Sequence, residues 1–197
     1  MESDMTTTTG DLTAGAQAEL TGNLTRYYLA RAIVAAAWVV AAVAIGRSNA
    51  TAAALLLVIY PAWDALANWF DAHGSGGLRA NPAQALNVAV SLIAAIAVAV
   101  ALPSSMNAVL AVLGIWAIAA GSAQLITGVR RWRTFGAQWA MILSGGQSML
   151  AGVFFVTQAG LARIPTIMDV APYAAFGAFY FMVSAAWLTF ANRRRTA

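Results

Sequence analysis

Six apolar segments of about 20 residues each follow one another along the chain, separated by short polar turns. A helix needs about 20 residues to cross the hydrocarbon core of a bilayer, whereas the strands of a membrane barrel alternate apolar and polar residues over about ten. The segments therefore predict an all-α, polytopic membrane protein: a six-transmembrane-helix bundle. The predicted spans are residues 27–46, 51–70, 83–102, 108–129, 138–156 and 172–191.

The composition excludes an ordinary soluble domain. Hydrophobic residues make up 61% of the 197 residues and charged residues only 9%, against about 25% charged residues in a typical soluble domain. A soluble chain of this composition could not cover its surface with polar groups, so lipid is the expected solvent. Cysteine is absent, which excludes disulfides and thiolate metal sites.

Polar segments flank the apolar region. Residues 1–25 are rich in Thr, Gly and acidic residues, and we expect a disordered N-terminal tail in the cytoplasm. Residues 26–192 form the predicted transmembrane domain, and residues 193–197 a basic cytoplasmic tail. Between the second and third spans, the run Gly74-Ser75-Gly76-Gly77 is expected to end one helix, because glycine can adopt the left-handed cap conformation. Asn81 is expected to cap the next helix, with Pro82 in its first turn.

Arginine placement predicts the orientation. All eleven basic residues are arginine, which together with the high alanine content suggests a bacterial source. Eight lie on one side of the predicted spans and two on the other, and positive loops face the cytoplasm. We therefore expect a multi-pass protein of the bacterial inner membrane with both termini cytoplasmic. The arginines gather at helix ends and not in one patch, so no nucleic-acid partner is expected; the expected partners are membrane lipids. The eight are Arg26, Arg79, Arg130, Arg131, Arg133, Arg193, Arg194 and Arg195.

An internal repeat is suggested by self-alignment. A shift of 56 residues places Tyr60 on Trp116, and a further shift of 64 places Trp116 on Tyr180. Each even-numbered span then carries a central aromatic residue, which predicts a bundle built from three helical hairpin repeats about a pseudo-threefold axis. The alternative is a shared alanine-rich composition without common ancestry.

The stretch 113–126, the pair Arg130-Arg131 and the Trp-led stretch 139–146 with its Ser-Gly resemble the HdeD-like membrane proteins, a family with a short repeat of unknown function. The resemblance extends over residues 27–192 and departs from the family pattern in the first hairpin, where the second span carries Asp64. It implies a six-helix inner-membrane protein. One family member is associated with acid resistance in enteric bacteria, so the resemblance also implies a stress-related role.

Arg31 and Asp64 are the ionisable residues within the predicted spans. A charged group at the centre of a membrane helix costs about 2.5–3.5 kcal/mol on insertion scales, so such residues are candidates for function. At about 1.5 Å of rise per residue, we expect both to lie roughly 6–9 Å inside the membrane and to form an ion pair. The pair is either a structural salt bridge, with Arg31 alternatively snorkelling to headgroups, or a gate or proton relay.

Polar side chains recur along the predicted helices. Such side chains find hydrogen-bond partners across helix interfaces, but they also line solute paths. Both readings stay open for a polar thread of Asn68, Asn87, Ser91, Gln124 and Gln147, to which Ser144 and Ser148 can be added. Small residues, among them Gly114, Gly121 and Gly152, are expected to let helices approach closely.

No catalytic signature is visible in the sequence. The phosphate-binding loop, the Gly-x-Ser-x-Gly elbow and the His-Glu-x-x-His helix are missing, and His73 is the only histidine. We therefore expect no enzyme activity, no cofactor, no metal and no small-molecule substrate. The leading hypothesis is a structural or stress-related membrane protein, with small-residue faces that allow a homo-oligomer. The alternative is a small solute or proton transporter or channel that uses Arg31 and Asp64.

Overall fold

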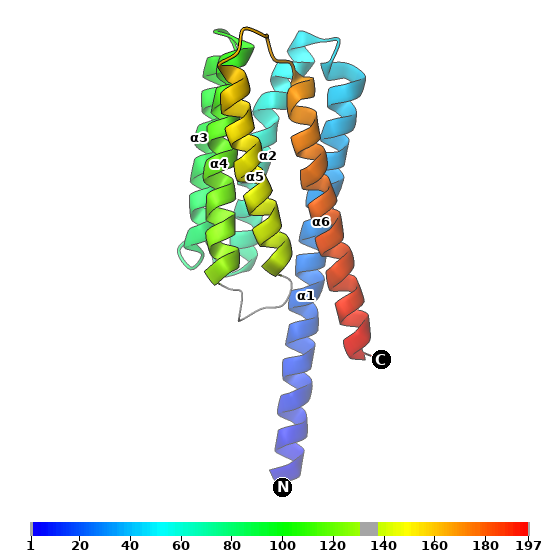
Figure 1. Ribbon diagram of the computed structural model, residues 1–197. Helices are drawn as coiled ribbons and strands as arrows, with labels where there is room; N and C mark the ends of the chain where they lie inside the picture. Colours follow the sequence, from blue (N-terminus) through cyan, green and yellow to red (C-terminus); the bar gives the residue numbers. More distant parts are fainter. Residues whose placement is uncertain (1, 131–137, 197) are drawn as a thin grey trace.

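The computed structural model describes residues 2–130 and 138–196, which form six helices that run alternately up and down (Figure 1). Within these residues the structure contains no strand. Both termini lie at one end of the bundle, here called the terminal end. The helices are α1 (Glu2–Ala41), which continues as the π-helical segment η1 (Ala42–Gly46), α2 (Ala50–Gly74), α3 (Pro82–Ala101), α4 (Met106–Arg130), α5 (Gln138–Ala159) and α6 (Ile167–Thr196).

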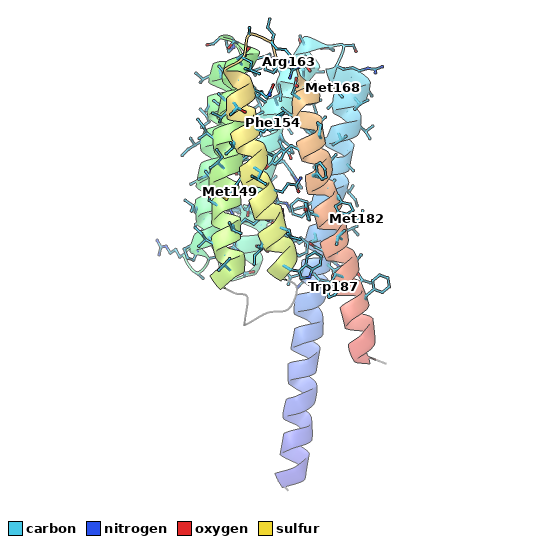
Figure 2. The ribbon with its side chains drawn as sticks, viewed as in Figure 1. Met149, Phe154, Arg163, Met168, Met182 and Trp187 are labelled. Atoms are coloured by element: carbon cyan, nitrogen blue, oxygen red, sulfur yellow. The ribbon has the colours of Figure 1, made fainter. Side chains whose placement is uncertain are left out.

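Large apolar side chains cover the outside of the bundle (Figure 2). On α3 alone, Ile93, Ile96 and Val100 are 65–71% exposed, and Phe154 and Trp187 project from α5 and α6. Such a large apolar surface is unfavourable in water, whereas it is the surface expected of a protein surrounded by lipid. Within the residues that the structure describes, five helices are long and apolar enough to cross a membrane, so the all-helical, multi-pass membrane architecture is confirmed. They are Gly22–Gly46, Ala50–Gly74, Pro82–Ala101, Met106–Val129 and Ile167–Phe190.

α5 is not among these five helices, so the count of six spans remains a prediction. α5 nevertheless runs the length of the bundle beside α4.

The ends of α1 and α6 differ from the expected boundaries. α1 begins at Glu2, so residues 2–25, which we expected to be disordered, continue the first membrane helix outward. The physical reason lies in residues 11–25, which contain several strong helix formers and no proline. α6 begins at Ile167 and not at residue 172, and it extends through the arginines at 193–195.

The connection between α2 and α3 begins in the predicted glycine run. α2 ends at Gly74, and Gly76 and Gly77, with φ of 94° and 86°, adopt the left-handed conformation expected of this run. Asn81 does not cap α3 through its side chain. Its Nδ2 instead donates hydrogen bonds to the carbonyls of Ser75 and Gly77, at 2.7 and 2.9 Å, and so ties the turn together.

The helices pair differently from the predicted hairpins. α4 packs closely on α5, α2 on α3, and α1 on α6, whereas α1 with α2 and α5 with α6 make few backbone contacts. Two pairs of glycines bring α4 and α5 together: a Cβ on Gly121 would lie 2.7 Å from the carbonyl oxygen of Gly145, and one on Gly114 would lie 2.8 Å from that of Gly152. Large aromatic side chains fill the wider space between the other helices.

The apolar core lies between the bundle centre and the end opposite the termini. Its fully buried members come from η1, α2, α3, α4 and α6. The core therefore separates the polar centre described next from the opposite end of the bundle. Its largest fully buried side chains are Leu57, Val98, Val109, Leu110, Leu113 and Val170.

Candidate functional site

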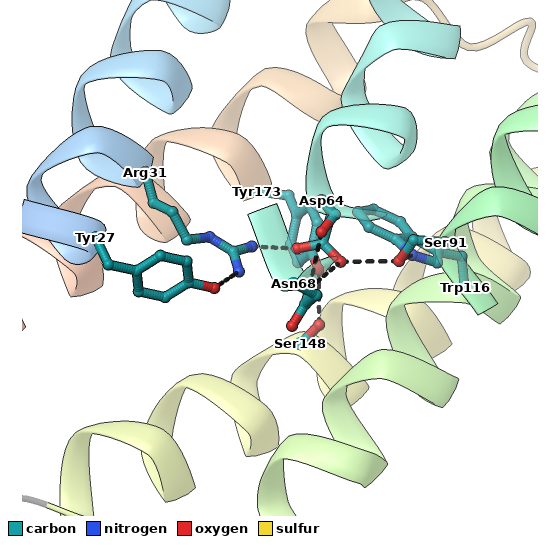
Figure 3. Close-up of polar contacts among 8 residues, drawn as sticks. All are labelled: Tyr27, Arg31, Asp64, Asn68, Ser91, Trp116, Ser148 and Tyr173. Atoms are coloured by element: carbon teal, nitrogen blue, oxygen red, sulfur yellow. Dashed lines mark hydrogen bonds and ion pairs between the residues drawn. The ribbon is translucent and has the colours of Figure 1, made fainter. Parts of the chain in front are cut away.

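Asp64 lies near the middle of α2, 14 residues after Ala50 and ten before Gly74. Its Oδ1 forms an ion pair with the guanidinium of Arg31 on α1, and the two side chains are only 16% and 14% exposed. Ten helical residues, about 15 Å of rise, separate Asp64 from the end of α2 at Gly74. Arg31 points into the bundle and does not snorkel outward (Figure 3).

The second carboxylate oxygen of Asp64 receives two hydrogen bonds. Ser91 Oγ on α3 donates to it at 2.8 Å, and Asn68 Nδ2, one turn along α2, donates at 3.1 Å. Ser91 Oγ in turn accepts a hydrogen bond of 2.9 Å from the indole Nε1 of Trp116 on α4. One unbroken chain of polar contacts therefore crosses α1, α2, α3 and α4 (Figure 3).

Aromatic rings surround the guanidinium of Arg31. The hydroxyl of Tyr27, one turn earlier on α1, accepts a hydrogen bond from Nη1 at 2.9 Å. The ring of Phe181 on α6 lies 4.4 Å from the guanidinium carbon, within the range of a cation–π interaction. Arg31 Nε is buried and has no acceptor among the described residues. The cation is thus held by one carboxylate, one phenol and one ring face.

α5 and α6 join the centre through Ser148 and Tyr173. Ser148 Oγ donates its proton to the carbonyl of Ala117, so the 2.7 Å contact with Tyr173 has the phenol as donor. The ring of Tyr173 meets Tyr60 and Trp116 edge to face, with centroids 6.1 and 6.2 Å away. Side chains from all six helices therefore meet at one level of the bundle.

The three even-numbered helices do contribute one ring each to this cluster, but the third ring is not the predicted one. Tyr173 occupies that place, whereas Tyr180 contacts Phe179. The ring contacts therefore do not follow the alignment that placed Trp116 on Tyr180, and the repeat itself stays a prediction.

The structure brings together some residues of the predicted polar thread. Asn68 and Ser91 both bind Asp64. Asn87 lies one turn from Ser91, and its Oδ1 is buried without a donor in the described part of the chain. Gln124 and Gln147 are half-buried and stay apart from the network of Asp64. The thread is therefore a cluster on α2 and α3 and not a path through all helices.

Several members of the centre were not assigned to it by sequence reasoning. Tyr27 was not singled out, although its position four residues before Arg31 places both on one helix face. Trp116 was noted only as a mark of the repeat. Tyr173 and Phe181 carried no signal beyond aromatic character, because nothing in the sequence states which face of α6 meets α1 and α5.

A second polar cluster organises the connection between α5 and α6, residues 160–166. Asn107 Nδ2 lies 3.1 Å from the carbonyl oxygens of both Ala159 and Leu161. Arg163 pairs with Asp169 in the first turn of α6, and this hydrogen bond raises the pKa of the guanidinium above its ordinary value. These contacts shape the turn at the end opposite the termini.

The chemistry available at the centre is that of one carboxylate, one guanidinium and neutral donors. Within the residues that the structure describes, no group of three histidine, aspartate or glutamate side chains is placed to hold a metal ion. The pair is internally neutral and well hydrogen-bonded, so it can join helices in a low-dielectric medium without leaving a net charge there. A carboxylate so placed can also accept a proton, if water reaches it.

The comparisons with known proteins concern the middle of the chain. Residues 88–157, from α3 to α5, match the family model described as a short repeat of unknown function (DUF308). This is the family of the HdeD-like membrane proteins, so the resemblance inferred from the sequence is confirmed. Neither the curated proteins nor the solved structures gave a match.

Proposed function

Because residues 88–157 carry the repeat of the HdeD-like family, we propose that the chain is a non-enzymatic, multi-pass protein of the bacterial inner membrane with a structural role. Its six helices all cross the membrane, and both termini face the cytoplasm. The arginine distribution supports this orientation, because the turn with Arg79 lies at the terminal end, whereas Arg47 and Arg163 lie at the opposite end.

The observation that carries the structural role is the pairing of Asp64. Its carboxylate is directed at Arg31 and not at lipid, and its other oxygen accepts hydrogen bonds from Ser91 and Asn68. Removing one partner from such a buried pair is far more costly than the pair is stabilising, so the pair selects one arrangement of helices. In this proposal the polar centre fixes the position of α1 and α6 relative to the other four helices. The backbones of α1 and α6 lie close to few residues of those helices, so side-chain contacts must hold them in place.

The alternative, a transporter or channel, is less well supported. Toward the end opposite the termini, Leu57 and Val98 occupy the same helix faces as Asp64 and Ser91, two turns away, and both are fully buried. A solute that reached the centre would have to cross this apolar layer.

Reconstitution in liposomes separates the two functions. The structural role predicts that proton and small-ion flux into vesicles with the purified protein equals that of protein-free vesicles, while Asp64→Asn lowers the stability of the detergent-solubilised protein. The opposite result would be flux above the background that Asp64→Asn abolishes while the protein stays folded and monodisperse, and this would establish the transporter.

The resemblance to the HdeD-like family adds a stress-related role to this proposal. Its test is the survival of cells that lack the protein after acid exposure, compared with cells that carry the intact chain or the Arg31→Ala variant. Equal survival of all three strains would reject the stress role and leave the structural role to be judged by stability.

A further inference from the structure

Two stripes of polar side chains face each other between α2 and α3. Asp64, Asn68 and Asp71 are spaced by four and three residues, so they share one face of α2. On α3, Gln84, Asn87 and Ser91 are spaced by three and four residues and share one face in the same way. We call these six residues the α2–α3 polar seam.

Hydrogen bonds fix the register of the seam at both of its ends. At the outer end, Gln84 Nε2 donates to Asp71 Oδ2 at 3.0 Å. At the inner end, Ser91 Oγ donates to Asp64 Oδ2 at 2.8 Å. Because α2 and α3 are antiparallel neighbours, this register places Asn68 opposite Asn87 between the two ends. The seam therefore runs without interruption from the first turn of α3 to the bundle centre.

The outer end and the middle of the seam each hold an acceptor that needs a donor. Gln84 Oε1 and Asn87 Oδ1 are buried, and neither accepts a hydrogen bond from a described residue. A buried amide oxygen without a donor is costly, and such oxygens in native proteins are usually satisfied by water. Two of them, one turn apart on the same face, define positions where small hydrogen-bond donors would be held.

The seam has an open end and a closed end. Its outer end lies beside the turn of residues 75–81, whose members are mostly exposed, at the terminal end of the bundle. Beyond Asp64 and Ser91 the same two helix faces continue with Leu57 and Val98, both 0% exposed. Polar side chains thus stop at the centre, and apolar packing begins there.

From these contacts we propose that the α2–α3 polar seam is a one-ended water path, through which water from the terminal end reaches Asp64 and goes no further. The ligand is water, held by the amide oxygens of Gln84 and Asn87. The Arg31–Asp64 pair would then exchange hydrogen bonds and protons with one compartment only. The inference goes beyond the structural role and is compatible with a bundle that does not conduct.

The absence of native cysteine allows a direct test by thiol labelling in sealed vesicles. Single substitutions Asn87→Cys in the seam and Val98→Cys in the apolar layer are exposed to a membrane-impermeant, cationic methanethiosulfonate from either side. The thiolate attacks the reagent, forms a mixed disulfide and releases methanesulfinate, so a reaction requires water at the thiol. Ser75→Cys and Gly160→Cys, in the turns at the two ends, report which side is which.

The proposal predicts that Asn87→Cys reacts from the same side as Ser75→Cys, at least about tenfold faster than Val98→Cys, because reaction needs a hydrated thiolate. Ser91→Cys, a nearly isosteric probe at the inner end, should follow Asn87→Cys and serves where the latter does not fold. Protection of both seam positions from both sides, at the rate of Val98→Cys, would overturn the proposal. So would equal labelling of Val98→Cys, which would mean that the path is not closed.

The same experiment tests the membrane orientation and the water path independently of each other. If Ser75→Cys were labelled from outside the cell, the cytoplasmic placement of the termini would be wrong. The seam would still be supported as long as Asn87→Cys reacted from the side of Ser75→Cys.

Discussion

Asp64 Oδ2 accepts a hydrogen bond of 2.8 Å from Ser91 Oγ, which joins α2 to α3 at the middle of the bundle. Ser91 is completely buried and also accepts the indole proton of Trp116 on α4. The hydroxyl of Ser91 therefore links Asp64 on α2 to Trp116 on α4. Because Ser91 is the junction between the carboxylate and the indole, its loss affects the partners on both α2 and α4.

Replacing Ser91 by alanine should destabilise the protein. Ser91→Ala leaves the indole Nε1 of Trp116 without an acceptor and removes one donor from Asp64, at a cost of about 1–3 kcal/mol in the free energy of unfolding. The measurement is denaturation by sodium dodecyl sulfate in mixed micelles. Ser104→Ala, in the exposed turn between α3 and α4, is the matched control and should change little. Equal effects of the two changes would argue against the hydrogen-bond chain.

The close approach of α4 and α5 predicts opposite responses of two glycines. Gly121→Ala places a methyl group 2.7 Å from the carbonyl oxygen of Gly145, so the helices must separate, at a cost of about 1–3 kcal/mol. Gly146→Ala meets no atom within 4 Å and gains helix propensity, so it should leave the protein as stable or stabilise it by up to about 1 kcal/mol. Thermal unfolding in detergent measures both. A neutral Gly121→Ala would contradict the backbone contact.

The membrane helices could be predicted from the sequence because length and hydropathy alone determine a span. The Arg31–Asp64 contact could also be anticipated, since two opposite charges in a low-dielectric bundle have few alternatives to each other. The arrangement of helices could not. Which helix faces which depends on side-chain volumes, such as the glycines at 114 and 121 that draw α4 onto α5, and no periodicity in the sequence reports it.

Two predictions about single residues were wrong for the same reason: contacts between helices and turns cannot be read from the sequence pattern. The ring that joins Tyr60 and Trp116 is Tyr173 and not Tyr180, because contacts depend on which face of α6 meets the other helices and not on the sequence alignment. Asn81 has the residue type and position of a helix cap, but its side-chain amide donates hydrogen bonds to carbonyl groups of the preceding turn instead. The sequence therefore identified Asn81 correctly as a structural residue, but it predicted the wrong hydrogen-bond partners for its side chain.

The turns at the two ends of the bundle should respond independently to loss of their asparagines. Asn107→Ala removes the donor held by the carbonyls of Ala159 and Leu161, so amide hydrogen exchange should accelerate in residues 160–166 and not in residues 75–81. Asn81→Ala should produce the reverse pattern. Faster exchange in both turns from either change would indicate global destabilisation and would reject the local role of these side chains.

The central claim is that Arg31 and Asp64 hold the bundle together as a pair, and a double-mutant cycle tests it most directly. The variants are Arg31→Leu, Asp64→Leu and the combination of both, and the measured quantity is the free energy of unfolding in mixed micelles. Each single change leaves one buried charge unpaired and should cost about 3–5 kcal/mol, whereas the double variant, with two apolar side chains, should be more stable than either single variant. Strictly additive losses, with the double variant the least stable of the three, would contradict the account.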